Sequence, residues 1–314
     1  MSGQGKPGEF DLIAELFAPL ADNDAALGLM DDAAVFTPPT GYDVVITTDA
    51  LVSGVHFPED ADGGLVARRL IACNISDLAA KGAQPAGCLL ILGVGPQWDA
   101  AFLTDFAAAF GAALSDYDMP LWGGDTVSTA TPFVSLTAHG LVPSGQMLTR
   151  GGAQDGDDVY VTGTIGDGWL DLPTRRPAYA DPQPPLGFGQ RLIGLAHAAL
   201  DVSDGLVADL DHMCRAGGGG MEIEGPSVPL SRNGRDYLAK GGALQDLLSG
   251  GDDLQIAFAA PPSAAEALVD AAKESATALT RIGRFTARAS SRSVTLLDES
   301  GAEISLSRRG YTHF

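Results

Sequence analysis

The chain has 314 residues, of which 45% are hydrophobic and 19% charged, a composition typical of a globular protein long enough for two domains. Its 40 acidic and 19 basic side chains give a formal net charge of −21. Nucleic acids and membranes are therefore poor candidate partners, because both present negative phosphates. If the substrate is itself anionic, bound divalent cations are the obvious means of cancelling the local charge.

The cysteines and the apolar segments bear on location. Cys73, Cys88 and Cys214 are odd in number and widely spaced, so they predict no disulfide framework, as in a reducing compartment. The N-terminal segment has no apolar core of signal-peptide length, and no segment approaches the ~20 apolar residues that a membrane span needs. We therefore expect a cytoplasmic protein.

The first half of the chain alternates strand and helix patterns. The expected elements are a strand at 43–49, a helix at 65–81 that stops at Gly82, a strand at 87–94, a helix at 99–117 and a strand at 133–142. This alternation indicates an α/β or α+β architecture.

A Pro- and Gly-rich stretch at 143–152 predicts a break in the chain. We accordingly divide the sequence into two domains, 1–147 and 148–314. The second half is expected to hold a strand from Asp158, a loop at 173–185, helices at 187–200 and 206–215, a flexible glycine run at 217–220, a strand at 254–259, a helix at 263–274 and a strand at 293–297.

The common nucleotide-binding motifs are absent from the sequence. There is no P-loop, no G-x-G-x-x-G between a strand and a helix, no protein-kinase signature and no nucleophile elbow. Any phosphate chemistry must therefore be organised differently.

Aspartates instead recur at strand ends and helix starts, beside hydroxyls and glycines. They are Asp32 in GLMDDAAVF, Asp49 after Thr47 and Thr48, Asp77 on the first helix, Asp125 in WGGD, and Asp201 and Asp204 around Ser203 in ALDVSDGL. A single Asp in such a place is more often a cap or turn residue. Together they match what magnesium prefers, since it takes hard oxygen ligands from carboxylates, phosphates and water.

Read in order, these segments resemble thiamine-monophosphate kinase, of the superfamily that includes aminoimidazole ribonucleotide synthetase. The matching stretches are GEFDLIAELF, DDAAV, TTDALVSGVHF, NISDLAAKGAQP, GGDTVS, LTRGGAQDGDDVYVTGTIGD, DVSDGLVADL and the terminal GYTHF. They run from Gly8 to Phe314, nearly the whole chain.

The resemblance implies a two-domain PurM-like fold. Its N-terminal α/β domain, which binds ATP and magnesium, would dimerise through a barrel of strands, and its C-terminal α+β domain would complete the active site. The implied reaction transfers the ATP γ-phosphoryl group to thiamine monophosphate. The implied partners are ATP, thiamine monophosphate and a second copy of the chain, and the implied cofactor is Mg²⁺, several ions of it.

The resemblance also assigns residues, motif by motif. Asp32, Asp49, Asp77, Asp125, Asp201 and Asp204 match magnesium ligands, and Thr47 and Thr48 match the hydroxyl positions that assist them. Gly124, Asp125, Arg150 and Ser203 match positions that hold ATP. His56, Asp252 and Tyr311 match positions that contact the thiamine moiety. Asp49, Asp77, Asp125 and Asp204 are the expected catalytic carboxylates.

The chemistry of these residues agrees with this assignment. An acceptor phosphate oxygen is already ionised at neutral pH, so positioning and charge neutralisation carry most of the catalysis. Arg150 suits bidentate phosphate binding. Tyr311 suits stacking on a cationic thiazolium ring.

The sequence departs from the family pattern at the acceptor side. Met30 precedes the paired aspartates in place of Gly, and the family motif GGEDYEL reads GGDDLQI. Asp252 thus replaces a longer Glu, while Leu254 and Gln255 replace an aromatic and an acid. Two alternatives stay open: a related synthetase that activates an amide or formyl oxygen with ATP, and a non-catalytic nucleotide-binding protein.

Overall fold

The computed structural model describes residues 8–287 and 293–312, and the chain divides into two compact units. Unit 1 comprises Met1–Ile75 and Pro85–Leu141, and unit 2 comprises Ser76–Gln84 and Val142–Phe314. The division falls inside one helix, so unit 2 includes a short segment from the first half of the sequence. The predicted domains, 1–147 and 148–314, have different boundaries from these two units. The separate roles expected of the two domains in ATP binding and in completing the active site stay a prediction.

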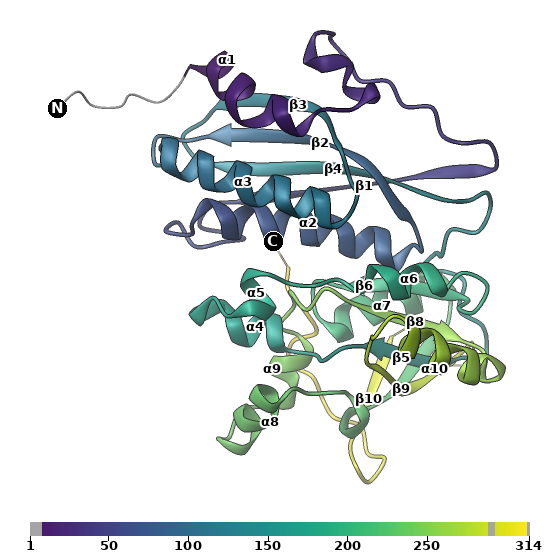
Figure 1. Cartoon of the computed structure of the whole chain (residues 1–314). Helices are drawn as coiled ribbons and strands as arrows, with labels where there is room; N and C mark the ends of the chain where they lie inside the picture. The colour runs from purple at the N-terminus through teal and green to yellow at the C-terminus, as the bar shows by residue number, and fades with distance from the viewer. Residues whose placement is uncertain (1–7, 288–292, 313–314) are drawn as a thin grey trace. The chain divides into compact units, whose positions relative to one another are not determined.

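Unit 1 is built on a four-stranded sheet in the order β1-β4-β2-β3. The strands are β1 (Tyr42–Val52), β4 (Phe133–Pro143), β2 (Gln84–Val94) and β3 (Leu121–Ser128). Figure 1 shows α2 (Gly63–Ala80) and α3 (Ala100–Asp116) running alongside this sheet. Short helical turns precede β1 at Glu9–Leu12, Ile13–Phe17, Ala18–Leu20 and Asp24–Leu29.

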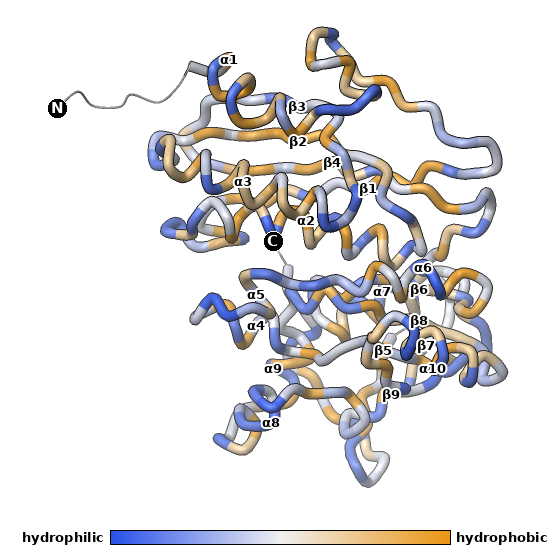
Figure 2. Tube along the Cα trace, viewed as in Figure 1, coloured by the Kyte–Doolittle hydropathy of each residue, from blue (hydrophilic) through white to orange (hydrophobic). Residues whose placement is uncertain are grey.

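One face of this sheet packs on the helices and the other keeps apolar side chains exposed. Along β4, buried and partly exposed residues alternate, as a half-buried strand requires. On the outer face, Ile46 is 62% exposed, Val127 39% and Ile91 38%. Figure 2 shows how strongly apolar the trace of β2 is. Such a face is suited to association with another surface.

Unit 2 is built on a six-stranded sheet in the order β10-β7-β9-β5-β8-β6. The strands are β5 (Asp158–Thr162), β6 (Ala198–Val202), β7 (Gly220–Glu224), β8 (Gln255–Ala260), β9 (Leu279–Thr286) and β10 (Val294–Leu297). All neighbouring pairs are antiparallel except β10 and β7. Its longer helices are α7 (Leu206–Gly217), α8 (Arg232–Ala239) and α10 (Ala265–Glu274). The shorter ones are α4 (Asp167–Asp171), α5 (Pro177–Ala180), α6 (Leu186–Arg191) and α9 (Leu244–Leu248).

Both faces of the second sheet are buried. One core contains Val159 of β5 with Leu210 and Met213 of α7. The other contains Tyr160, the next residue of β5, with Phe188 and Leu268 of the helices α6 and α10. Because successive side chains point to opposite faces, β5 is buried at every position.

The same burial explains a wrong prediction. The apolar run at 187–200 predicted one helix, but α6 ends at Arg191 and Ala198 opens the strand β6. A strand buried on both faces has no alternation, so periodicity does not separate it from a helix. The expected loop at 173–185 also contains the short helix α5. The glycine run at 217–220 ends in a strand, since Gly220 opens β7. The other predicted strands and helices are present with shifted ends, and β7 and β9 were not predicted.

No helix in the part of the chain that the structure describes is long and apolar enough to cross a membrane.

Candidate active site

The loop between β6 and α7 carries Ser203 and Asp204. Its geometry is set by Asp209, a buried residue in the first turn of α7, whose carboxylate accepts the N–H of Ser203 at 3.1 Å and of Asp204 at 3.0 Å. The N-cap of α7 is Gly205, at φ 115°, so Asp204 does not cap the helix. The side chain of Asp204 is therefore partly exposed at the surface of unit 2.

Two distant segments of unit 2 are held against this loop. Asp252 donates its N–H to the carbonyl oxygen of Ser203 at 2.8 Å, and Tyr311 donates its N–H to that of Asp204 at 2.9 Å. Gly251 passes so close to Ser203 that a Cβ would overlap its carbonyl oxygen. The structure thus brings together four residues that the sequence places in three separate motifs.

Asp201, on β6, is a buried carboxylate beside other acids. Ser76, on α2, donates its hydroxyl to Asp201 at 3.0 Å. Burial raises the pKa of Asp201 well above its ordinary value, the negative charges of Asp77 and Asp209 raise it further, and the Ser76 hydrogen bond and Lys81 act in the opposite direction. The site therefore concentrates carboxylates that favour a cation.

Two cations lie near these acids. Lys81 follows α2 and donates from Nζ to the carbonyl oxygen of Ala199 at 2.9 Å. Burial lowers the pKa of Lys81 to about 8, the positive charge of Arg150 lowers it further, and Asp201 and Asp77 oppose the shift. Arg150 is itself exposed, and the backbone just before it is fixed by a bond from Ala199 N–H to the Thr149 carbonyl oxygen at 3.1 Å. An exposed guanidinium on a fixed backbone suits phosphate.

The candidates in unit 1 are distributed over its sheet and the segment before it. Thr47 and Asp49 lie on one face of β1, and Thr48 lies on the other, because side chains alternate along a strand. Thr48 donates its hydroxyl to the Leu136 carbonyl oxygen at 3.1 Å. Thr47 and Thr48 therefore do not point to the same place, and only Thr47 shares a face with Asp49.

The other candidate residues of unit 1 differ in their exposure and in the contacts that they make. Asp32 and Asp125 are exposed. Gly124 pairs with Leu90 so closely that a Cβ would overlap the Leu90 carbonyl oxygen, which gives this glycine a structural role. His56 is partly buried, and its Nδ1 accepts the N–H of Val52 at 3.0 Å.

The candidate metal ligands of each unit suit magnesium, because they are carboxylate and hydroxyl oxygens and include no cluster of thiols or imidazoles. Within the described ranges, however, no three His, Cys, Asp or Glu side chains approach closely enough to hold a metal ion. A magnesium ion at this site would thus need phosphate oxygens and water to complete its coordination, which is its usual arrangement.

Two residues of this neighbourhood were not predicted from the sequence as site residues: Lys81 and Asp209. For Asp209 a signal was present, since a carboxylate in the first turn of a helix after a Gly-containing loop often accepts free backbone N–H groups. His313 and Phe314, at the end of the GYTHF motif, lie outside the described residues.

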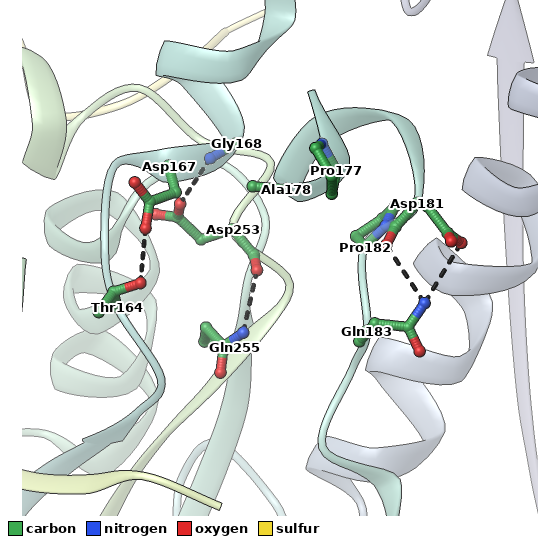
Figure 3. Close-up of a pocket in the computed structure, with 10 residues that line it drawn as sticks. All are labelled: Thr164, Asp167, Gly168, Pro177, Ala178, Asp181, Pro182, Gln183, Asp253 and Gln255. Carbon is green, nitrogen blue, oxygen red and sulfur yellow. Dashed lines mark hydrogen bonds between the residues drawn. The ribbon is translucent and has the colours of Figure 1, made fainter. Parts of the chain in front are cut away.

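A pocket of about 210 Å³ opens elsewhere on unit 2. Figure 3 shows Asp253 and Gln255 on one side of it and Pro177, Pro182 and Gln183 on the other, with Ala178 next to Asp253. Asp253 is buried and accepts the N–H groups of Gly166 and Gly168 at 2.8 to 3.1 Å. Burial raises the pKa of Asp253 to about 7, and these two hydrogen bonds oppose the shift.

Comparison with known proteins identifies the family. Residues 30–142 match the model of the AIR synthase related protein, N-terminal domain, and residues 154–295 match that of the C-terminal domain. The thiamine-monophosphate kinase of Caulobacter vibrioides is 40% identical over 298 residues, which cover 89% of this chain and 84% of that protein. This chain belongs to the thiamine-monophosphate kinase family.

Solved structures agree with the family and the fold. The crystal structure of thiamine-monophosphate kinase from Stenotrophomonas maltophilia K279a is 36% identical, with a TM-score of 0.82 over 92% of this chain and 96% of that one. The structure of AaThiL complexed with AMPPCP and TMP is 26% identical, with a TM-score of 0.75 over the full length of both chains. The predicted two-domain PurM-like α/β fold and the predicted enzyme class are confirmed.

Proposed function

We propose that this member of the thiamine-monophosphate kinase family transfers the γ-phosphoryl group of ATP to thiamine monophosphate, giving thiamine diphosphate and ADP. The observation that carries the proposal is the convergence of Ser203, Asp204, Asp252 and Tyr311 through backbone hydrogen bonds in unit 2. These residues match the nucleotide, metal and acceptor positions of the family. The relative of known structure that holds AMPPCP and TMP supports the choice of substrates.

In the proposed reaction, an oxygen of the acceptor phosphate attacks the γ-phosphorus of ATP in line with the leaving group. The bond from the γ-phosphorus to the β–γ bridging oxygen breaks, and ADP leaves with the electron pair. No general base is needed, because the attacking oxygen is already ionised. Ser203 and Arg150 would hold ATP phosphates, and Asp252 and Tyr311 would orient the acceptor.

Magnesium, when bound, supplies the positive charge that phosphoryl transfer between two anions requires. In unit 2 the residues proposed to hold it are Asp77, Asp201 and Asp204. In unit 1 they are Asp32, Asp49 and Asp125, with Thr47. Thr48 is the weakest member of the predicted set, because its hydroxyl donates to a backbone carbonyl on the other face of β1.

A homodimer is part of the same proposal. The outer face of the unit 1 sheet exposes Ile46, Ile91 and Val127, and a second copy of the chain would cover these side chains. A reducing cytoplasm is the proposed location, since none of Cys73, Cys88 and Cys214 forms a disulfide bond in the described structure.

The roles of Asp204 and of in-line transfer are tested separately. Asp204→Asn should lower kcat at least ~100-fold, since it removes a charge near the transferring group. The matched variant Asp270→Asn, on the exposed surface of α10, should leave kcat unchanged. ATP with an isotopically chiral γ-phosphoryl group should give product with inverted configuration. Retention would indicate two transfers through a phosphorylated enzyme and would contradict the direct reaction.

A further inference from the structure

The last described residues of the chain run back onto unit 2 and end at the loop that carries Asp204. Ile304 and Leu306 pack against the core of this unit. Residues 308–311, which we call the C-terminal strap, then reach the loop. There Tyr311 donates its N–H to the carbonyl oxygen of Asp204 at 2.9 Å. The end of the chain is therefore a support of the proposed metal site.

Arg309 ties the strap to α7 through a buried carboxylate. Its Nε and Nη2 donate to the two carboxylate oxygens of Asp211 at 2.5 and 2.8 Å, and Nη2 also donates to the Val294 carbonyl oxygen at 2.8 Å. The side chain of Asp211 is only 6% exposed, and it accepts the Val294 N–H as well, at 2.7 Å. Because a bidentate pair is specific in its geometry, it fixes the position of Arg309.

The residue after Arg309 lets the strap lie directly on the loop. A Cβ on Gly310 would lie 2.8 Å from the Asp204 carbonyl oxygen and 2.3 Å from the Cβ of Ala208 on α7. A side chain at this position would therefore push the strap away. The ion pair of Arg309 and the backbone bond of Tyr311 are thus joined by a short, closely packed piece of chain.

Two carboxylates of α7 hold the Asp204 loop from two sides. Asp209 accepts N–H groups of the loop directly. Asp211, two residues later on the same helix, acts through Arg309 and the strap, which donates to a carbonyl oxygen of the loop. Bonds to both kinds of backbone group restrict local opening of the loop.

We propose that Arg309 is a positioning residue: through its ion pair with Asp211 it holds the strap on the loop and so keeps Asp204 in the place that phosphoryl transfer requires. Both residues lie just outside the matching stretches DVSDGLVADL and GYTHF. The inference rests on the proposed function for the role of Asp204. The contacts that carry it do not depend on that function.

Arg309→Gln tests the inference, because it removes the charge and the bidentate geometry and keeps a polar side chain. The matched control is Arg281→Gln, in the same unit. Arg281 pairs with the buried Asp158 at 2.8 Å and with Glu224 at 3.0 Å, and its side chain is 39% exposed, against 41% for Arg309. The control therefore breaks a similar ion pair that has no bond to the loop.

Two measurements are made on the full-length protein. Hydrogen exchange, followed by mass spectrometry of the peptide that spans 202–205, reports whether the loop opens, with or without catalysis. Steady-state kinetics with ATP and thiamine monophosphate gives kcat and the magnesium concentration at half-maximal rate.

We expect Arg309→Gln to speed exchange in the loop peptide at least ~3-fold, because the strap no longer restrains the loop. We expect kcat to fall ~10-fold and the half-maximal magnesium concentration to rise, since Asp204 is displaced. Arg309→Lys, which keeps the charge without the bidentate geometry, should fall between this variant and the wild type. Arg281→Gln should keep the wild-type exchange and kcat.

A double variant shows whether Arg309 acts through Asp211. Asp211→Asn should change exchange and kcat in the same direction as Arg309→Gln. Adding Arg309→Gln to Asp211→Asn should then cause little further change, because both substitutions break the same pair. Independent, additive effects would overturn the proposed link.

The outcomes separate this inference from the proposed function. An active wild type with unchanged loop exchange or unchanged kcat in Arg309→Gln would overturn the inference alone. Equal falls in kcat for Arg309→Gln and Arg281→Gln would overturn it too, since stability alone would explain them. An inactive wild type, with faster loop exchange in Arg309→Gln only, would overturn the proposed function and support the positioning of the loop. If Arg309→Gln does not fold, Arg309→Lys decides by the same measurements.

Discussion

The carboxylate of Asp209 accepts the backbone N–H of Asp204 at 3.0 Å, and it accepts that of Ser203 at 3.1 Å. This buried side chain on α7 therefore fixes a loop whose own side chains are at the surface. The proposed nucleotide and metal contacts of unit 2 depend on that loop. Small displacements of positioned groups are costly in catalysis.

Asp209→Ala removes the carboxylate oxygen that accepts both backbone N–H groups. We expect a loss of about 1–3 kcal/mol in the free energy of unfolding, because a buried N–H loses its acceptor. We also expect kcat to fall ~10-fold or more through displacement of the loop. Chemical denaturation and steady-state kinetics measure the two effects.

The matched control for this substitution is Asp157→Ala. Asp157 is another buried carboxylate of unit 2, and it accepts the Gln154 N–H at 2.8 Å and contacts His197 at 3.0 Å. The control variant should lose a similar amount of free energy of unfolding and should keep the kcat of the wild type. Equal falls in kcat for the two variants would show that Asp209 acts only through overall stability.

Gly124→Ala tests the structural role of the glycine before Asp125. Because a Cβ there would overlap the Leu90 carbonyl oxygen, the parallel pair β2–β3 must separate. We expect a loss of about 3 kcal/mol or more in the free energy of unfolding, at the upper end of overpacking effects. Gly187→Ala, in α6 with open space around it, should be neutral or slightly stabilising. Wild-type stability of the Gly124→Ala protein would contradict this structural role. Contact with a phosphate would then be the remaining reason for a glycine at this position.

Part of the fold and of the candidate site could be predicted from the pattern of residue types, and part could not. The place of Asp201 and Asp204 on either side of Ser203, just before a helix, could be predicted, because the helical pattern that follows them is visible in the sequence itself. The strand at Ala198–Val202 was hidden, since burial on both faces removes alternation. The roles of Asp209 and Lys81 depend on backbone groups of other segments, Ser203–Asp204 and Ala199, and no local pattern shows those contacts.

Asp253 should make stability depend on pH. Burial raises its pKa from the ordinary 3.8 to about 7, so between these values the folded protein binds more protons than the unfolded chain. The contribution of Asp253 to the free energy of unfolding therefore decreases as pH rises toward about 7 and is constant above it. Its slope should be at most about 1.4 kcal/mol per pH unit. Urea unfolding from about pH 5 to about pH 8, for the wild type and for Asp253→Asn, measures the difference, and parallel profiles would contradict the assignment.

Ile46→Asp tests the proposed dimer face. Ile46 is 62% exposed on the outer side of the unit 1 sheet, and a buried charge at an interface is costly. We expect the wild type to sediment as a dimer and Ile46→Asp as a monomer. Val269→Asp, at an apolar residue 47% exposed on α10, should remain dimeric. A monomeric wild type, or a dimeric Ile46→Asp, would rule out this face as the interface.

The most direct test of the account is the stoichiometry of the reaction itself. The purified protein is incubated with ATP, magnesium and thiamine monophosphate, and nucleotides and thiamine phosphates are separated by chromatography. We predict one thiamine diphosphate for each ADP formed, with the reaction abolished by EDTA and restored by added magnesium. Magnesium-dependent ATP binding without thiamine diphosphate would contradict the central claim and would mean that the acceptor is a different molecule.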